Sequence, residues 1–327
     1  MPVSLTVTVE KWPIAGAFAI SRGAKTEAVV VVAALSDGTW TGRGECVPYG
    51  RYGETVETVT AAIDGVRAAL EAGADREALQ SLLPPGAARN ALDCAAWDLA
   101  AKQARRSAAA LAGEAPPQPC TTAFTISLGD PQAMGAAAAK AAHRPLLKIK
   151  LGAEGDAARI AAVREAVPSA TLIVDANEGW TADTLRDNFE ACRRASVTLI
   201  EQPLPADDDG LLGEIAHPVP VCADESVHGL ASLAALKGKY DAINIKLDKT
   251  GGLTEALALA ARARHDGFLV MAGCMVATSL SMAPAMLIAQ HAAVVDLDGP
   301  LLLARDRPDG LRYDGSIVHP ASSALWG

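Results

Sequence analysis

The chain has 327 residues, half of them apolar and 4% aromatic, a length that suits two domains or one large α/β domain with an addition. A net charge of −9, without any cluster of lysine and arginine, argues against nucleic acid and anionic membranes as partners. Six cysteines without a CxxC pair indicate a reducing compartment, and the N-terminus lacks the basic and apolar regions of a signal peptide, so we expect a soluble, cytoplasmic protein.

An antiparallel meander is predicted at the N-terminus. Residues 4–10 and 27–35 are rich in valine and are predicted strands, joined by a glycine-containing loop over residues 17–26. The Asp37-Gly38 turn then leads into a third strand.

Two helical segments follow this meander. Apolar residues recur at the spacing of a helix face over residues 54–72 and 88–110. The proline-rich segment 115–119 is a predicted linker. Residues 1–115 are therefore expected to form an α+β domain.

The next part of the chain repeats a unit of one strand and one helix. Short apolar runs end in a charged residue about every 25 residues, with one double interval. These ends are Lys150, Asp175, Glu201, Asp224, Lys246 and Asp296. Eight strand candidates over residues 116–300 predict a (β/α) barrel of the TIM type. A doubly wound open sheet is the alternative, but it would favour a glycine-rich dinucleotide loop, which the sequence lacks.

One long stretch without charged residues, 267–295, imitates a membrane span. It contains Pro284, Gln290 and His291, and it lacks flanking basic residues. A buried strand followed by a buried helix is the better interpretation, so no membrane partner is expected.

The strand LLKIKL carries two lysines on one face. Because side chains alternate along a strand, Lys148 and Lys150 point the same way, opposite to their apolar neighbours. Two adjacent ammonium groups on an apolar strand repel each other and resist burial unless an anionic group lies beside them. The alternative is an edge strand with a solvated lysine face.

Three carboxylates end three consecutive strands of the predicted barrel: Asp175, Glu201 and Asp224. Strand C-termini converge on one mouth of a barrel, and three carboxylates gathered there need a cation to stay ionised. Oxygen ligands alone suit a hard ion such as Mg²⁺. The alternative is that these acids cap the helices that follow.

Lys150 and Lys246 end the second and sixth strands, so they face each other across the predicted mouth. A substrate carboxylate bound to the metal would place its α-carbon between the two amines, where one removes a proton and the other delivers one to the opposite face. Lys148 would add a further cation. Neighbouring positive charge would lower the pKa of a lysine, as a general base requires. This geometry predicts racemisation or epimerisation.

The last strand ends in Asp296 and Asp298, whose carboxylates share one face. Such a pair at the mouth would bind a cationic group, for instance a substrate amine; the alternative is turn formation. Arg22, in a glycine-flanked loop, is a weaker candidate for pairing with a second substrate carboxylate. Thr125 and Arg51 are weaker candidates as well.

Several segments resemble the enolase superfamily in its muconate lactonising subgroup: LLKIKL, TLIVDANEGW, LIEQPLP, ADES, INIKLDKTGG and DLDGP. SRG, RYGE, GAARNALDCAAWDLA, GCMVATS and DLDGP are similar to the dipeptide epimerases, in particular those acting on L-Ala-D/L-Glu. The resemblance covers nearly the whole chain. It implies a modified (β/α)₇β barrel over 116–300, an N-terminal capping domain over 1–115, and a C-terminal tail, 301–327, that packs back on the cap.

By motif, the resemblance implies that Asp175, Glu201 and Asp224 ligate Mg²⁺. It implies that Lys150 and Lys246 are the two acid/base catalysts. A dipeptide would be the substrate, deprotonated and reprotonated at one carbon through an enediolate.

The resemblance also implies how the ends of the dipeptide are held. Asp296 and Asp298 would hold its α-ammonium, Thr125 would contact it, and the counterpart of Arg22 would meet a glutamyl side chain. We therefore predict epimerisation of L-Ala-D-Glu to L-Ala-L-Glu, in the recycling of murein peptides. Gly50 stands where proline is expected, which leaves the fine specificity open.

Other functions remain open at this point. Cycloisomerisation and o-succinylbenzoate synthesis share the metal and lysine set, but their substrates carry no amine for the two terminal aspartates. A Schiff-base or pyridoxal-phosphate barrel using Lys246 would leave the three carboxylates unexplained. A non-catalytic binding protein would be expected to lack one of these residues. A homo-oligomer is compatible with the sequence.

Overall fold

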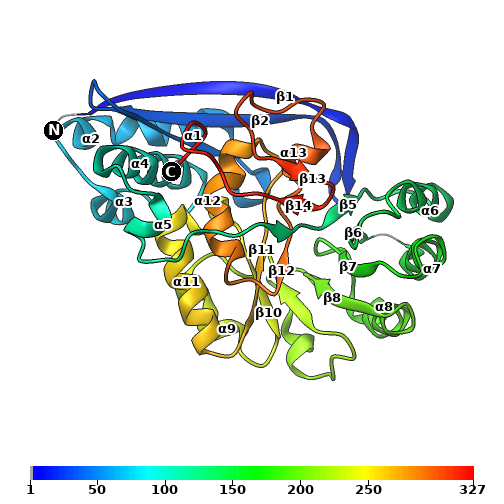
Figure 1. Ribbon diagram of the computed structural model, residues 1–327. Helices are drawn as coiled ribbons and strands as arrows, with labels where there is room; N and C mark the ends of the chain where they lie inside the picture. The colour runs from blue at the N-terminus through cyan, green and yellow to red at the C-terminus, as the bar shows by residue number, and fades with distance from the viewer. Residues whose placement is uncertain (1–2, 153) are drawn as a thin grey trace.

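An antiparallel sheet opens the chain. The computed structural model describes residues 3–152 and 154–327, and within them β1 (Ser4–Ile20), β2 (Gly23–Ser36) and β3 (Thr41–Cys46) pair in that order. The predicted antiparallel meander is confirmed. Figure 1 shows β1 and β2 running together from the N-terminal helices to the first strands of the barrel.

The β1–β2 hairpin is longer than the sequence suggested. The loop predicted for residues 17–26 is wrong, because strand pairing resumes at Phe18 and Lys25 and continues to the turn at Arg22. A register shift precedes this outer part, where Gly16 has a φ of 97°, and a bulge of this kind lets a hairpin bend and keep pairing. The outer part carries Arg22 to the barrel.

Short helices follow the sheet. They are a 3₁₀ helix (Gly50–Tyr52), α1 (Val56–Gly65), α2 (Arg67–Glu71), α3 (Arg76–Leu82), α4 (Ala87–Ala104) and α5 (Ala108–Leu111). Each of the two predicted helices is divided in two. The second is interrupted after α4, where the C-cap residue Arg105 has a left-handed φ of 52°. Ser107 then caps α5 by accepting a hydrogen bond from the Ala110 amide.

Helix α4 packs tightly on β3. A Cβ at Gly42 would lie 2.2 Å from the Ala95 carbonyl oxygen, and one at Gly44 would lie 2.1 Å from that of Ala91. Only glycine permits this approach of helix and strand backbones, which explains the TGRG sequence of β3.

Within the described ranges, eight parallel strands form a second sheet in chain order. They are β5 (Phe124–Ile126), β6 (Leu146–Lys150), β7 (Thr171–Asp175), β8 (Val197–Glu201), β9 (Val221–Ala223), β10 (Ala242–Ile245), β11 (Leu269–Ala272) and β12 (Val294–Val295). The Ala123 amide donates to the Val295 carbonyl at 2.8 Å, which joins the first strand to the last. The predicted barrel is confirmed, and the open-sheet alternative is wrong.

Helices surround this barrel, and Figure 1 shows α6 to α8 and α11 outside the strands. They are α6 (Pro131–Lys140), α7 (Asp156–Ala166), α8 (Ala182–Arg194), α9 (Leu233–Leu236), α10 (Leu247–Thr250), α11 (Leu253–His265), α12 (Ser279–Ala289) and α13 (Gly299–Leu302), with 3₁₀ turns at Gly210–Gly213 and Leu230–Ser232. The connection from β8 to β9 thus contains a 3₁₀ turn in place of an α-helix.

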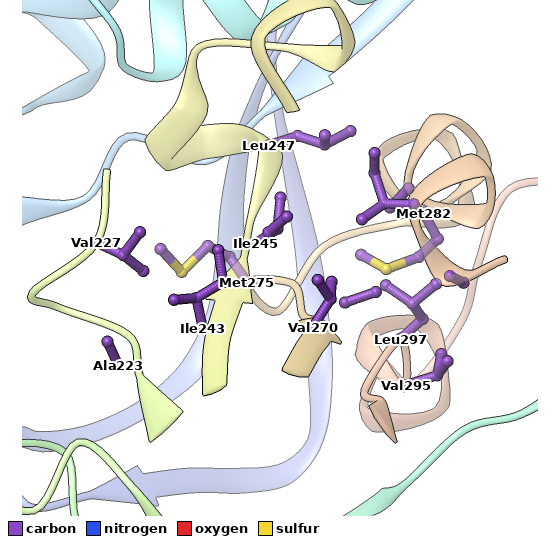
Figure 2. Close-up of a cluster of buried hydrophobic side chains, with 14 of the residues drawn as sticks. Ala223, Val227, Ile243, Ile245, Leu247, Val270, Met275, Met282, Val295 and Leu297 are labelled. Carbon is purple, nitrogen blue, oxygen red and sulfur yellow. The ribbon is translucent and has the colours of Figure 1, made fainter. Parts of the chain in front are cut away.

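Alternating side chains divide the barrel strands between two apolar cores. An inner layer fills the barrel and consists of Ala123, Ile173, Leu199, Cys222, Ala242 and Met271. Outward side chains pack against the helices, and Figure 2 shows Ile243, Ile245 and Val270 of this outer core with Met282 of α12. The inner layer closes the barrel below the polar strand ends.

The uncharged stretch 267–295 forms β11, α12 and β12. Helix α12 has 11 residues, all of them buried, so the predicted buried strand and helix are confirmed. Among the described residues, no helix combines the length and the apolar character needed to cross a bilayer.

The last residues return to the N-terminal helices. The strands β13 (Tyr313–Asp314) and β14 (Ile317–Val318) form a small sheet with β4 (Cys120–Thr121). The Trp326 indole then donates to the Cys94 carbonyl of α4 at 3.0 Å, and the Gly327 amide donates to Asp98 at 2.8 Å.

Helix α4 also holds the segment that follows β10. Arg89 donates to the carbonyl oxygens of Thr250 at 2.7 Å and Gly251 at 3.1 Å. The buried Asp248 carboxylate accepts from the Asn90 amide and from the Val47 backbone, both at 2.9 Å. These bonds tie the cap to α10, immediately after Lys246.

Asp248 is expected to make stability depend on pH. Burial raises its pKa to about 7, so the folded state holds a proton that the unfolded state releases near pH 4. Its contribution to stability is therefore lost as the pH rises through 7. Relative to Asp248→Asn, the wild type is expected to lose about 2–3 kcal/mol of unfolding free energy between pH 5 and pH 8. Urea unfolding of both proteins at the two pH values measures this; a constant difference would contradict it.

Candidate active site

The C-terminal ends of the barrel strands surround a cavity of about 570 Å³. Its lining includes Lys150, Asp224, Lys246, Asp296 and Asp298, together with other predicted site residues, namely Arg22, Thr125 and Lys148. The β1–β2 hairpin and residues 47–56 cover the opening. The site therefore lies between the cap and the barrel.

The three predicted metal ligands lie together. Asp175, Glu201 and Asp224 are buried, and each offers a carboxylate oxygen within 4.8 Å of the others. Asp175 ends β7, Glu201 ends β8 and Asp224 directly follows β9, so the parallel register brings them side by side. Three buried carboxylate oxygens this close together are a donor set that fits Mg²⁺. The alternative of simple helix caps does not account for this convergence.

The charge states within this triad differ. Burial raises the pKa of Glu201 to about 7, and the neighbouring Asp175 charge adds to the effect. Burial would also raise the pKa of Asp224, but Lys246 and Lys249 outweigh it and hold that pKa well below its usual range. Binding a divalent cation would favour the ionised form of all three groups.

Lys150 and Lys246 approach the triad from opposite sides. Lys150 Nζ lies 2.6 Å from Asp175 Oδ2, and Lys246 Nζ lies 2.6 Å from Asp224 Oδ2. The strand β6 that carries Lys150 is separated from β10, which precedes Lys246, by β7, β8 and β9. The predicted opposition across the mouth is confirmed.

The lowered lysine pKa expected of a general base is not found at Lys246. Burial lowers the pKa of Lys246, but Asp224 and Glu201 outweigh burial and raise it well above its usual value. Positive neighbours were expected to dominate, yet the nearest group is a carboxylate. Lys246 is therefore a proton donor here and needs the charge of that carboxylate to be neutralised before it can act as a base.

Lys148 lies deeper than Lys150 and is 1% exposed. Its ammonium contacts Glu201 at 2.6 Å, Asp296 at 2.8 Å and Asp175 at 3.1 Å. Burial lowers its pKa, but the three carboxylates outweigh burial and raise it well above the usual value. Lys148 thus links the triad to Asp296, and the alternative of a solvated lysine face is wrong.

Asp296 and Asp298 follow β12, and Lys148 lies between Asp296 and the triad. Asp298 Oδ2 accepts a 2.7 Å bond from the Thr125 backbone amide, so Thr125 reaches this pair through its main chain. Burial and the neighbouring Asp296 raise the pKa of Asp298 to about 7. Asp296 Oδ1 is buried and has no hydrogen-bond partner among the described residues. A cationic donor in the cavity would satisfy it.

Arg22 reaches the mouth from the hairpin turn. It donates to Glu225 at 2.7 Å, to the Asn177 carbonyl at 2.9 Å and to Glu178 at 3.2 Å. Arg51 donates two 2.7 Å bonds to the same Glu178. A network of ion pairs thus connects the β1–β2 hairpin and residues 47–56 to the barrel.

Several residues of the site were not predicted from the sequence. Glu178 and Glu225 lie within three residues of predicted metal ligands. This short spacing could have placed them at the mouth of the barrel. Gln202 accepts hydrogen bonds from the Asp224 amide at 2.8 Å and the Ser226 amide at 3.1 Å. Gln202 and Glu178 have φ values of 33° and 66°, a backbone strain that clusters at functional sites.

Two family matches cover most of the chain. Residues 2–113 match the N-terminal domain of the mandelate racemase/muconate lactonizing enzyme family, and residues 133–320 match an enolase C-terminal domain-like family. L-Ala-D/L-Glu epimerase of Escherichia coli K12 is 48% identical over 97% of this chain and 99% of its own. N-acetyl-D-glutamate racemase of Pseudoalteromonas is 44% identical over 91% and 95%, respectively.

Solved structures agree with these matches. An enolase family member of Agrobacterium tumefaciens with homology to dipeptide epimerases, holding sodium and L-Ala-L-Glu, is 55% identical with a TM-score of 0.98 over 100% of both chains. A dipeptide epimerase of Enterococcus faecalis V583, complexed with Mg and L-Leu-L-Tyr, is 26% identical with a TM-score of 0.90 over 99% of both chains.

Proposed function

Because the chain belongs to the mandelate racemase/muconate lactonizing enzyme family of the enolase superfamily, we propose that it is a magnesium-dependent dipeptide epimerase that interconverts L-Ala-D-Glu and L-Ala-L-Glu. One observation carries this proposal. Lys150 and Lys246 lie 2.6 Å from the outer two carboxylates of the triad, on opposite sides of the mouth. A carbon held between them has one amine on each face.

The proposed roles of the residues follow from this geometry. Asp175, Glu201 and Asp224 would hold Mg²⁺, which when bound supplies the positive charge that stabilises the deprotonated substrate. One lysine removes the α-proton of the C-terminal residue from one face. The other lysine returns a proton to the opposite face, which inverts the configuration.

The charges of the site residues indicate where each end of the substrate would bind. The partnerless oxygen of Asp296 would accept a hydrogen bond from the α-ammonium of the dipeptide, with Asp298 beside it. Arg22 would meet the glutamyl carboxylate, which takes over from Glu225 or Glu178 as its partner. Thr125 would contact the substrate near Asp298.

Racemisation of N-acetylglutamate is a second candidate, because one relative at 44% identity has that name. The two substrates differ at the nitrogen: the dipeptide carries an ammonium, whereas the acetyl derivative is neutral there. Two buried aspartates at the mouth favour the ammonium. The same argument disfavours cycloisomerisation and o-succinylbenzoate synthesis.

Asp296→Asn is expected to separate the two candidates. Loss of a hydrogen bond between charged groups costs about 1.5–3 kcal/mol, so kcat/KM for L-Ala-L-Glu should fall about 10- to 100-fold. Any turnover of N-acetyl-L-glutamate should fall by less, because that substrate loses no ammonium contact and is affected only through the pair of Asp296 with Lys148. Proton NMR or polarimetry follows both reactions, with the exposed Asp207→Asn as a matched control. Wild-type preference for N-acetylglutamate would favour the second candidate.

We also propose a place for the reaction in the recycling of murein peptides, in the cytoplasm. An L-Ala-D-Glu unit is supplied by hydrolysis of peptides that contain D-glutamate, and its epimer becomes a substrate for ordinary dipeptide hydrolysis. Assembly into a homo-oligomer is a further proposal, which sedimentation would test.

A further inference from the structure

A third buried lysine, Lys249, contacts the triad but takes no part in the proton transfer described above. Lys249 lies in α10, three residues after Lys246, and is 2% exposed. Its ammonium donates to Asp224 Oδ1 at 2.5 Å, to the Asp224 carbonyl at 2.5 Å and to the Asn244 carbonyl at 3.0 Å. An ammonium has three donors, so all three are used, and none is left for a substrate.

The two oxygens of Asp224 therefore have different partners. Lys249 holds Oδ1, whereas Lys246, which lines the cavity, holds Oδ2. Lys246 must leave Oδ2 in order to act on a substrate, and its attraction to Asp224 opposes that departure. A fixed positive charge on the other oxygen weakens the attraction.

The other triad members repeat this division. Asp175 Oδ1 accepts from the Asn177 backbone amide at 2.9 Å, and Glu201 Oε1 accepts from the Asn244 side chain at 2.7 Å. Their second oxygens contact Lys150 and Lys148, both at 2.6 Å. Each carboxylate thus has one oxygen held by the scaffold and one held by Lys148, Lys150 or Lys246. Asp224 differs because its scaffold partner carries a full charge.

We propose that Lys249 is a positioning residue, the fixed counter-ion of Asp224, which holds Oδ1 and weakens the attraction of Oδ2 for Lys246, so that Lys246 can leave it. The proposal rests on the proposed function and adds a role to it. Without Lys249, Asp224 would direct its whole charge toward Lys246 and the metal. The cation should then bind more tightly, while Lys246 acts more slowly.

Lys249→Met tests the proposal through two readouts that move in opposite directions. Calorimetric titration of the substrate-free protein with Mg²⁺ is expected to give a Kd about tenfold lower than that of the wild type, because a nearby positive charge is removed. In D₂O with Mg²⁺, α-proton exchange from one epimer is expected to slow about 10- to 100-fold, within the range of general acid–base effects. Exchange from the other epimer, which depends on Lys150, should change less than about threefold.

Further variants keep the test decisive. Lys249→Gln is a second neutral variant if the methionine variant does not fold, and Lys249→Arg retains the charge and should stay close to the wild type in both readouts. Lys102→Met removes a comparable lysine, paired with Asp98 at 2.8 Å on α4, and should alter neither readout. Weaker Mg²⁺ binding, or equal slowing of both epimers, would overturn the proposal. Wild-type protein that exchanges no dipeptide would instead overturn the proposed function.

Discussion

Replacing Lys246 with alanine is expected to abolish epimerisation, with a loss of about 10³-fold or more, because one of the two proton-transfer groups is gone. The half-reaction of Lys150 should survive. One epimer of the dipeptide should therefore still exchange its α-proton with D₂O and retain its configuration, while the other exchanges slowly. Lys150→Ala is expected to give the mirror-image result. Proton NMR of each epimer, incubated separately with each variant and Mg²⁺, measures these rates.

The double variant and a control complete this experiment. With both lysines replaced, exchange should cease for both epimers, and exchange that persists would exclude the two-base mechanism. Lys140→Ala, on the exposed end of α6, should behave like the wild type. Trapping of substrate on Lys246 by borohydride would instead support a Schiff-base reaction.

Removal of the metal is expected to have an effect of similar size. Neutralising the charge that develops on the substrate carboxylate contributes several kcal/mol, which corresponds to about 10³-fold in rate. Chelation with EDTA should therefore abolish exchange from both epimers alike, and added Mg²⁺ should restore it. This symmetry distinguishes loss of the metal from loss of one lysine.

A ligand variant provides the matching control for chelation. Glu201→Gln keeps the size of the side chain but removes a charge, so it should raise the Kd for Mg²⁺ at least tenfold by calorimetry and lower activity at limiting Mg²⁺. Full activity in protein shown to be free of divalent metal would contradict the metal-dependent mechanism. It would leave the lysines to act through a covalent adduct.

The barrel and its charged strand ends were predictable because they follow local rules. A strand that ends in a polar residue recurs at a regular interval, and parallel register then places Asp175, Glu201 and Asp224 side by side. The opposition of Lys150 and Lys246 follows from counting strands in a closed ring. Neither feature depends on how the side chains pack in the interior.

The cover of the site was less predictable because its contacts join distant residues. Arg22 pairs with Glu225, which lies 203 positions away, and nothing local in either segment specifies the other. The hairpin that carries Arg22 contains glycines typical of a loop, yet cross-strand pairing overrides them. The raised pKa of Lys246 also comes from contacts between strands, because the charges of Asp224, at 2.6 Å, and of Glu201 outweigh burial.

The most direct test of the two-base epimerisation is proton NMR of the wild-type protein in D₂O with Mg²⁺ and L-Ala-L-Glu, L-Ala-D-Glu and a small set of other dipeptides. We expect the α-proton of the C-terminal glutamate to exchange from either epimer and both epimers to reach the same equilibrium mixture, while the alanine α-proton is retained. Failure of every dipeptide to exchange its C-terminal α-proton would contradict this expectation.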